Sequence, residues 1–469
     1  MPGTALDAPR DDEAAAERAP FDGLALERAY LQLAQEREGD HASRAAAQAY
    51  LDASPAKDHG GETVPWGFVP KLFSRRDAER LAHMAETMGA VMDKLTRAYR
   101  TDPAVRRAFG FSPLIERLSL APVPYRALIP IARVDVFLDE RTGAYKFCEL
   151  NTDGSAGMML TTEVGRALQG TATYRVFAES HALAAYDLYG QCADAVISCA
   201  REALGDDVLR DGLRIAAVDY AESVYLAEIQ ELANAFEARG ARLRFTDVRD
   251  LSYRDGVLSD AQGPIDAVFH RVVTGELADK PCPGADALAA CAEEGRVPIV
   301  GAFRTWPAAT KTAFAVFHSP LAETFLTPEE LVFVRAHVPE TVVLDEKTDL
   351  SRFRDRSRWI AKPADGYAGK GVVAGLDATD DSWAETLAEL AGVHGIVQEY
   401  VPQPSMPFMP GTPSVDSEGS DDTPAFEVNA MIGLYLFNGR FGGVFTRVGT
   451  SNIIDYTTSR YNLATFVVD

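Results

Sequence analysis

The sequence predicts a mixed α/β fold with several domains, and three observations support this prediction. Residues 211–301 alternate short apolar strands with helical stretches, which is typical of a small, mostly parallel sheet. Residues 132–151 show a period of two, as expected of two strands joined by a turn. From Lys311 onward, helical patterns mix with antiparallel strands. At 469 residues, the chain is long enough for two or three domains.

The order of these patterns divides the chain into four predicted regions. An N-terminal helical region is expected because apolar residues recur at helical spacing in 25–35, 42–53 and 77–100. The next region holds the two strands, followed by two helices. A Pro-, Ser-, Gly- and Asp-rich stretch at 402–425 is interpreted as a flexible loop and a candidate lid. The predicted boundaries are 1–110, 111–210, 211–301 and 302–469.

Composition is that of a soluble globular protein, with 47% hydrophobic and 25% charged residues. No apolar run approaches the roughly 20 residues that span a bilayer, so no membrane partner is expected. The acidic, Ala- and Pro-rich start of the chain does not resemble a signal peptide. The five cysteines form no C-x-x-C pair, which favours reduced thiols and a cytoplasmic location.

The charge balance is strongly acidic, with 46 basic and 69 acidic residues and a formal net charge of −23. Such a field repels a nucleic-acid backbone, so nucleic acid is not expected as a partner. It also favours a cationic amine as a substrate. The alternative interpretation is that an acidic surface only keeps the protein soluble.

The stretch ARVDVFLDERTGAYKFCELN, residues 132–151, contains the most informative pair of strands. Side chains alternate faces along a strand, so Arg133 and Asp135 should share one face, and Glu149 and Asn151 should share a face of the next strand. Counting from the turn places Asp135 opposite residue 147 or 148. Asp135 and Glu149 would then be neighbours at roughly 5–8 Å. Cys148 is expected on the opposite face from Glu149.

Two carboxylates this close need a positive partner. Arg133 alone could supply it, in an ion-pair network with a purely structural role. A hard cation such as magnesium (Mg2+) is the other interpretation, because it takes carboxylate and amide oxygens and bridges substrate phosphates. Asp135, Glu149 and Asn151 are an appropriate ligand set for it.

A candidate phosphate-binding loop lies at residues 358–375, RWIAKPADGYAGKGVVAG. A strand ends at Lys362, and a loop with Gly366, Gly369 and Gly371 follows. Glycines let backbone N–H groups close around phosphate oxygens, and a lysine adds a charge. Because Val follows Gly371, this is not a G-x-x-x-x-G-K-[ST] P-loop, and a plain hairpin is the alternative. Lys362 is expected to be exposed, so its loss should barely change thermal stability.

The strand GIVQEYV, residues 395–401, offers side chains that could meet an adenine edge and a ribose. These side chains belong to the tripeptide Gln398-Glu399-Tyr400, which by itself is also compatible with an ordinary strand end. Lys-Pro, a Gly-rich loop and Q-E-Y-V together resemble the nucleotide site of ATP-grasp ligases. Because the R-x-D…E-x-N strands precede the lysines, the order resembles the circularly permuted ATP-grasp group, to which the synthetase domain of glutathionylspermidine synthase belongs. The resemblance covers roughly residues 110–460.

This resemblance implies a role for each matched residue. Asp135, Glu149 and Asn151 would bind magnesium, and Arg133 and Arg447 would act on the transferred phosphoryl group. ATP would be held by Lys311, Lys362, Gly366, Gly369, Gly371, Gln398, Glu399 and Val401. A second Glu-x-Asn occurs at Glu427 and Asn429. We predict that Glu149 belongs to the metal site, because only the first pair has Asp135 and Arg133 nearby.

The implied activity is ATP-dependent joining of a small carboxylate to an amine through an acyl-phosphate. There is no room for the amidase domain of some glutathionylspermidine synthases, and the acid and amine are not specified by the sequence. Two alternatives remain: a peptide ligase that uses aminoacyl-tRNA, which the net charge disfavours, and an ATP-binding module without turnover. The intact set of charged residues argues against the latter.

Overall fold

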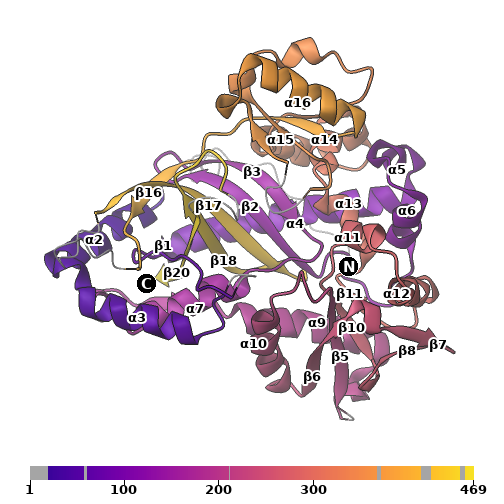
Figure 1. The fold of residues 1–469 in the computed structure, drawn as a ribbon, viewed down its shortest axis with the longest axis horizontal. Coiled ribbons are helices and arrows are strands. Elements are labelled where there is room, and N and C mark those ends of the chain that lie inside the picture. Colours follow the sequence, from indigo (N-terminus) through magenta and orange to yellow (C-terminus); the bar gives the residue numbers. More distant parts are fainter. Residues whose placement is uncertain (1–18, 58–60, 211, 367–370, 413–423, 455–459) are drawn as a thin grey trace.

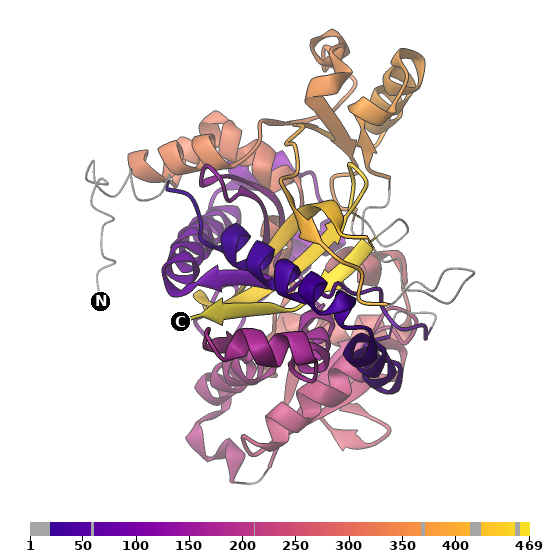
Figure 2. The same ribbon diagram turned by 90° about the vertical axis from the view of Figure 1, so that its left-hand side faces the viewer.

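The computed structural model describes residues 19–57, 61–210, 212–366, 371–412, 424–454 and 460–469. Three groups of elements surround a central antiparallel sheet (Figure 1). A smaller antiparallel sheet from residues 341–399 lies on one side, a parallel α/β unit from residues 213–300 on another, and the helices of residues 23–53 on a third; Figure 2 shows the first two groups at opposite ends of the molecule. Among the described residues, no helix has the length and apolar character needed to cross a membrane.

The central sheet joins strands from both halves of the chain. Its order is β19-β18-β17-β2-β3, with β16 also paired to β17. All these pairs are antiparallel. The strands are β2 (Ile131–Asp139), β3 (Ala144–Asn151), β16 (Ser405–Phe408), β17 (Phe426–Phe437), β18 (Arg440–Gly449) and β19 (Arg460–Leu463).

One face of this sheet is covered by the long helix α4 (Arg75–Thr101). A capping box between Ser74 and Asp77 begins the helix. Its apolar stripe packs on Val134, Val136 and other alternate residues of the strands. The opposite face therefore carries Arg133 and Asp135, as the period of two predicted. Other helices of the N-terminal half are α2 (Gly23–Glu36), α3 (His41–Ala53), α5 (Pro103–Phe109), α6 (Pro113–Leu120), α7 (Met158–Gln169), α8 (Ala172–Ala178) and α9 (Leu188–Leu204).

The last strand pairs with two segments that lie far from it in the sequence. Strand β20 (Thr465–Val468) lies between β1 (Lys71–Ser74), to which it is parallel, and β4 (Leu183–Ala185), to which it is antiparallel.

The predicted parallel sheet is present, with all its strands parallel in the order β11-β10-β5-β6. It comprises β5 (Leu213–Asp219), β6 (Ala241–Asp247), β10 (Ala267–His270) and β11 (Ile299–Val300). Helices α10 (Leu226–Glu237), α11 (Thr274–Asp279) and α12 (Pro283–Glu294) accompany it. Three short antiparallel strands that the sequence pattern did not indicate follow β6: β7 (Ser252–Arg254), β8 (Val257–Asp260) and β9 (Gly263–Pro264).

The remaining antiparallel sheet has the order β12-β15-β13-β14. A small core that includes Phe353, Trp359 and Trp383 supports it. Its strands are β12 (Thr341–Val343), β13 (Trp359–Lys362), β14 (Val373–Ala374) and β15 (Ile396–Glu399). The helices of this region are α13 (Trp306–Ala309), α14 (Thr312–His318), α15 (Pro328–His337) and α16 (Asp380–Gly392).

Candidate active site

A cavity of about 240 Å³ is lined by the central sheet and the β12–β15 sheet, and it collects most of the predicted site residues. Asp135 and Gly371 are not among the lining residues, and Gly369 lies outside the described residues. The predicted residues that line the cavity are Arg133, Glu149, Asn151, Lys311, Lys362, Gly366, Gln398, Glu399, Val401 and Arg447. Residues from five separate stretches of sequence thus line one space.

The β2–β3 pairing differs from the predicted register. Asp135 lies directly opposite Glu149, and the register then shifts so that Val136 faces Phe147. Cys148 is the extra residue of a β-bulge, and it lines the cavity together with Glu149. The predictions that Asp135 faces residue 147 or 148, and that Cys148 points to the other face, were therefore wrong, because a bulge breaks the period of two. Burial raises the pKa of the Cys148 thiol.

Asp135 is fully buried between two arginines. Its Oδ1 accepts a hydrogen bond from Nε of Arg133 at 2.7 Å, and its Oδ2 accepts one from Nη2 of Arg133 at 2.9 Å. Nη2 of Arg447 also donates to Oδ2, at 3.2 Å. Both carboxylate oxygens are therefore occupied by guanidinium groups. Such charge-assisted, two-point pairing is strong and holds a fixed geometry.

Glu149 and Asn151 fit a hard cation better than Asp135 does. Burial raises the pKa of the Glu149 carboxyl, but nearby cations, with Lys311 first, outweigh burial and lower it below its ordinary value. Glu149 therefore carries a negative charge into the cavity. The Nδ2 atom of Asn151 is buried without a hydrogen-bond partner, so this amide can donate to an acceptor oxygen of a ligand, and its Oδ1 is an oxygen of the kind that a hard cation takes. Among the described residues, no three His, Cys, Asp or Glu side chains cluster as a metal site.

Lys362 ends β13 and is buried, with 8% of its surface exposed. Its Nζ donates to Oε1 of Gln398 at 2.8 Å. Burial lowers the pKa of the Lys362 ammonium to about 8. The prediction of an exposed loop lysine was therefore wrong: β15 and the cavity wall pack around the strand end, which the local sequence does not reveal.

Lys311 precedes α14, and its Nζ donates to the backbone carbonyl of Gly366. The same ammonium lies 3.5 Å from Oε1 of Glu149. Lys311 therefore connects the loop after β13 to the β3 carboxylate. In that loop, Gly371 has φ of +70°, and a Cβ there would lie 2.9 Å from Cγ of Pro363, so glycine is required.

A further wall of the cavity comes from residues 153–156, directly after β3, which our sequence predictions missed. Gly154 has φ of +64°, and a Cβ there would lie 2.6 Å from the carbonyl oxygen of Arg271. Nη1 of Arg271 donates to the carbonyl of Ser155 at 2.7 Å, and Nη2 donates to Glu228 at 2.9 Å. The parallel α/β unit thus fixes this wall. The glycines and polar residues that follow Glu-x-Asn were the available signal.

The second Glu-x-Asn lies elsewhere. Glu427 is exposed on β17, where it pairs with Pro407, and it is not among the residues that line the cavity. Nδ2 of Asn429 donates to the carbonyl of Ser451 at 3.1 Å. The choice of Glu149 over Glu427 as the metal residue stays a prediction.

Comparison with known proteins finds likeness in structure only. No protein-family model and no curated protein matches the chain. A glutathione synthetase-like effector (GSS30) from Globodera pallida, in its apo form, matches with a TM-score of 0.61 and 12% identity, over 91% of this chain and 96% of that one. The predicted mixed α/β fold class is confirmed, because the chain has mixed and parallel sheets and shares its fold with this glutathione synthetase-like protein.

Two other structures match less well. A putative gamma-glutamylcysteine synthetase from Methylobacillus flagellatus has a TM-score of 0.40 and 13% identity, over 78% of this chain and 83% of that one. D-cycloserine synthetase DcsG has a TM-score of 0.28 and 14% identity, over 54% of this chain and 90% of that one. The circular permutation and the glutathionylspermidine synthase resemblance stay predictions.

Proposed function

We propose that the protein is an ATP-dependent ligase that joins a small carboxylate to an amine. The observation that carries this proposal is the convergence of two arginines, two lysines and a Glu-x-Asn pair on one cavity. An anionic nucleotide needs such cations, and a divalent ion needs such oxygens. The glutathione synthetase-like fold agrees with this proposal.

ATP would lie against the β12–β15 sheet. Lys311 and Lys362 would contact its phosphates, and backbone N–H groups at Gly366 and Gly371 would lie near them, while residues 367–370 lie outside the described part of the chain. Gln398, Glu399 and Val401, which line the cavity on β15 and just after it, would hold the nucleoside. The hydrogen bond from Lys362 to Gln398 supports this proposal. It holds the lysine proposed to contact the phosphates beside the amide proposed to contact the nucleoside.

Glu149 and Asn151 would hold magnesium, which would neutralise charge on the phosphates when bound. A carboxylate is a poor electrophile, so it first attacks the γ-phosphorus of ATP to give an acyl-phosphate and ADP. Arg133 and Arg447 would stabilise the negative charge of the transferred phosphoryl group. The amine then attacks the acyl carbon, the C–O bond to phosphate breaks, and an amide forms.

The finer parts of this proposal are the permuted chain order and the likeness to glutathionylspermidine synthase. The strand order of the central sheet supports the permuted chain order. Strand β3, which carries Glu149, pairs with β2, and β2 pairs with β17 from the C-terminal part of the chain. The four-region division of the chain belongs to the same proposal. A cationic acceptor amine stays a prediction from the net charge.

The test is release of ADP across a panel of carboxylates and amines, each also omitted singly. We expect ADP only when one carboxylate and one amine are both present, or a slow release with the carboxylate alone. Nuclease treatment should change nothing. ATP binding without ADP release under every condition would show a binding module, and loss of activity with nuclease would show use of aminoacyl-tRNA.

A further inference from the structure

We infer that Asp135 is not a metal ligand but a positioning residue, which holds Arg133 and Arg447 side by side with their guanidinium groups toward the cavity. This inference rests on the proposed function and deepens it. It departs from the role that the ATP-grasp resemblance implies for Asp135. The site that results is an anion site of two guanidinium groups, beside a metal site formed by Glu149 and Asn151.

Burial and direction support this inference. The side chain of Asp135 is 0% exposed, whereas those of Arg133 and Arg447 are each 9% exposed. Both arginines line the cavity, and Asp135 does not. The carboxylate therefore lies behind the guanidinium groups, on the side away from any ligand. A metal ion in the cavity would have to displace an arginine to reach it.

The hydrogen bonds use both oxygens of Asp135. Arg133 takes Oδ1 and Oδ2 with Nε and Nη2, and its Nη1 donates to the carbonyl of Ala156 at 2.7 Å. Arg447 takes Oδ2 with Nη2. In contrast, Nε of Arg447 has no hydrogen-bond partner. This atom is buried, in a residue that is only 7% exposed, so the donor lacks an acceptor. An unsatisfied buried donor on a cavity-lining arginine indicates a missing anionic ligand.

The surroundings are shaped for this pair. Gly433 lies opposite Asp135 on β17, and a Cβ at Gly433 would be 2.7 Å from Cδ of Arg133 and 2.9 Å from Oδ1 of Asp135. Both guanidinium groups also lie over the Phe445 ring, with Cζ at 5.2 Å for Arg133 and 5.6 Å for Arg447. Glycine thus provides the space for the pair, and one aromatic ring supports both cations.

The charge balance gives the arrangement its purpose. Two buried guanidinium groups repel each other, and one carboxylate between them removes most of that cost. The remaining charge is positive by one and faces the cavity. Donors fixed before the ligand arrives need no reorganisation when phosphoryl charge develops, which is the property of an efficient anion site.

The experiment compares metal binding with anion binding in four forms of the full chain: wild type, Asp135→Asn, Gly433→Ala and Glu149→Gln. Mn2+ is titrated in the presence of saturating β,γ-methylene-ATP and followed by water-proton relaxation. Inorganic phosphate is titrated calorimetrically in the presence of MgADP. Thermal midpoints are measured for all forms. Gly433→Ala keeps every charged group and disturbs only their positions, so it tests the inference even if Asp135→Asn does not fold.

We expect Asp135→Asn and Gly433→Ala to weaken phosphate binding by about 10-fold or more and to leave the Mn2+ Kd within about twofold of wild type. Glu149→Gln should weaken Mn2+ by at least about 10-fold. Asp135→Asn weakening Mn2+ as much as Glu149→Gln, with phosphate binding unchanged, would overturn the inference. Unchanged phosphate binding in Gly433→Ala would also overturn it. If wild type does not bind the nucleotide analogue at all, the proposed function itself fails.

Discussion

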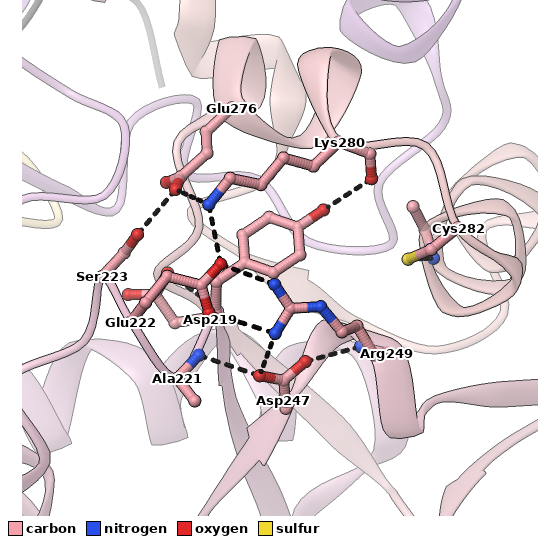
Figure 3. Close-up of polar contacts among 11 residues, drawn as sticks. Asp219, Ala221, Glu222, Ser223, Asp247, Arg249, Glu276, Lys280 and Cys282 are labelled. Atoms are coloured by element: carbon pink, nitrogen blue, oxygen red, sulfur yellow. Dashed lines mark hydrogen bonds and ion pairs between the residues drawn. The ribbon is translucent and has the colours of Figure 1, made fainter.

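Two clusters of charged residues in this protein have similar distances between their charged atoms, but one cluster is buried and the other is exposed to solvent. The first is the buried group of Arg133, Asp135 and Arg447. The second lies at the carboxyl ends of β5 and β6, where Glu222 accepts from Arg249 at 2.5 Å and from Lys280 at 2.9 Å (Figure 3). The side chains of Glu222 and Arg249 are each 48% exposed. Distance alone would rank the second cluster as the stronger.

Solvent reverses this ranking. Hydrogen bonds from Arg249 and Lys280 lower the pKa of Glu222 to about 2, but water and salt screen such exposed pairs, so they contribute little to stability. In the buried cluster the side chain of Asp135 is 0% exposed, so removing one member leaves an uncompensated charge in a buried position. Burial, rather than the distance between charged atoms, therefore decides which cluster matters. The exposed cluster has only a local role, because it holds the loop after β5 against α11, through Ser223 and Glu276 at 2.6 Å.

The largest expected effect contrasts two glutamates near the central sheet, one in the cavity and one on the surface. Glu149→Gln should lower ADP formation by about 100-fold or more, because the cavity loses the carboxylate that we propose as a magnesium ligand. Glu427→Gln should retain much of the rate. Both rates are measured by coupled ADP release, with thermal midpoints as the control for folding. The reverse ranking at equal stability would mean that the metal site is at Glu427 and that the chain is not permuted.

The second prediction measures the cost of opening the buried cluster. Asp135→Ala should lower the free energy of unfolding by about 3–5 kcal/mol, because two guanidinium groups stay buried without their carboxylate. Urea denaturation followed by tryptophan fluorescence gives this value. In an Arg447→Met background, the same substitution should cost less. Equal costs in the two backgrounds would show that Asp135 and Arg447 do not act together.

The third prediction uses the lowered pKa of Lys362, about 8. Without nucleotide, the ammonium loses its proton as pH rises through 8. Bound phosphates favour the charged form, so ATP binding near pH 8.5 should take up a proton, and ATP affinity should fall at higher pH. Calorimetry in two buffers of different ionisation enthalpy counts the protons. Lys362→Gln should bind ATP more weakly and lose this proton uptake, and the same uptake in both forms would contradict the assignment.

The smallest effect is expected at the exposed cluster. Glu222→Gln should leave the thermal midpoint close to that of wild type at low salt, and the difference should vanish in 1 M NaCl, where charges are screened beyond about 3 Å. Scanning calorimetry at both salt concentrations provides the measurement. A loss as large as that of Asp135→Ala would remove the distinction between the two clusters.

Local sequence predicted much of the cavity, because its main residues lie in short patterns. The alternation in β2 indicated the shared face of Arg133 and Asp135, and the Lys-Pro-x-x-Gly stretch indicated Lys362 and Gly366. The rest depends on contacts between distant segments. The bulge at Cys148 adds a residue that a strict period of two cannot show, and the burial of Lys362 depends on β15. The carboxylate of Asp135 accepts one of its hydrogen bonds from Arg447, which lies 312 residues away in the sequence.

The strand order of the central sheet has a consequence for synthesis of the chain. Strand β2 is hydrogen-bonded on one edge to β3. Its other edge stays unpaired until β17 has been synthesised. Gly433 of β17, which pairs with Asp135 of β2, follows it by 298 residues (433 − 135), so at about 5–20 residues added per second the wait is about 15–60 s. During that interval, the nascent chain exposes an unpaired strand edge, the kind of surface that recruits chaperones or other chains. Chains that end before β17 keep this edge open, so we expect early termination to yield aggregates rather than a smaller stable protein.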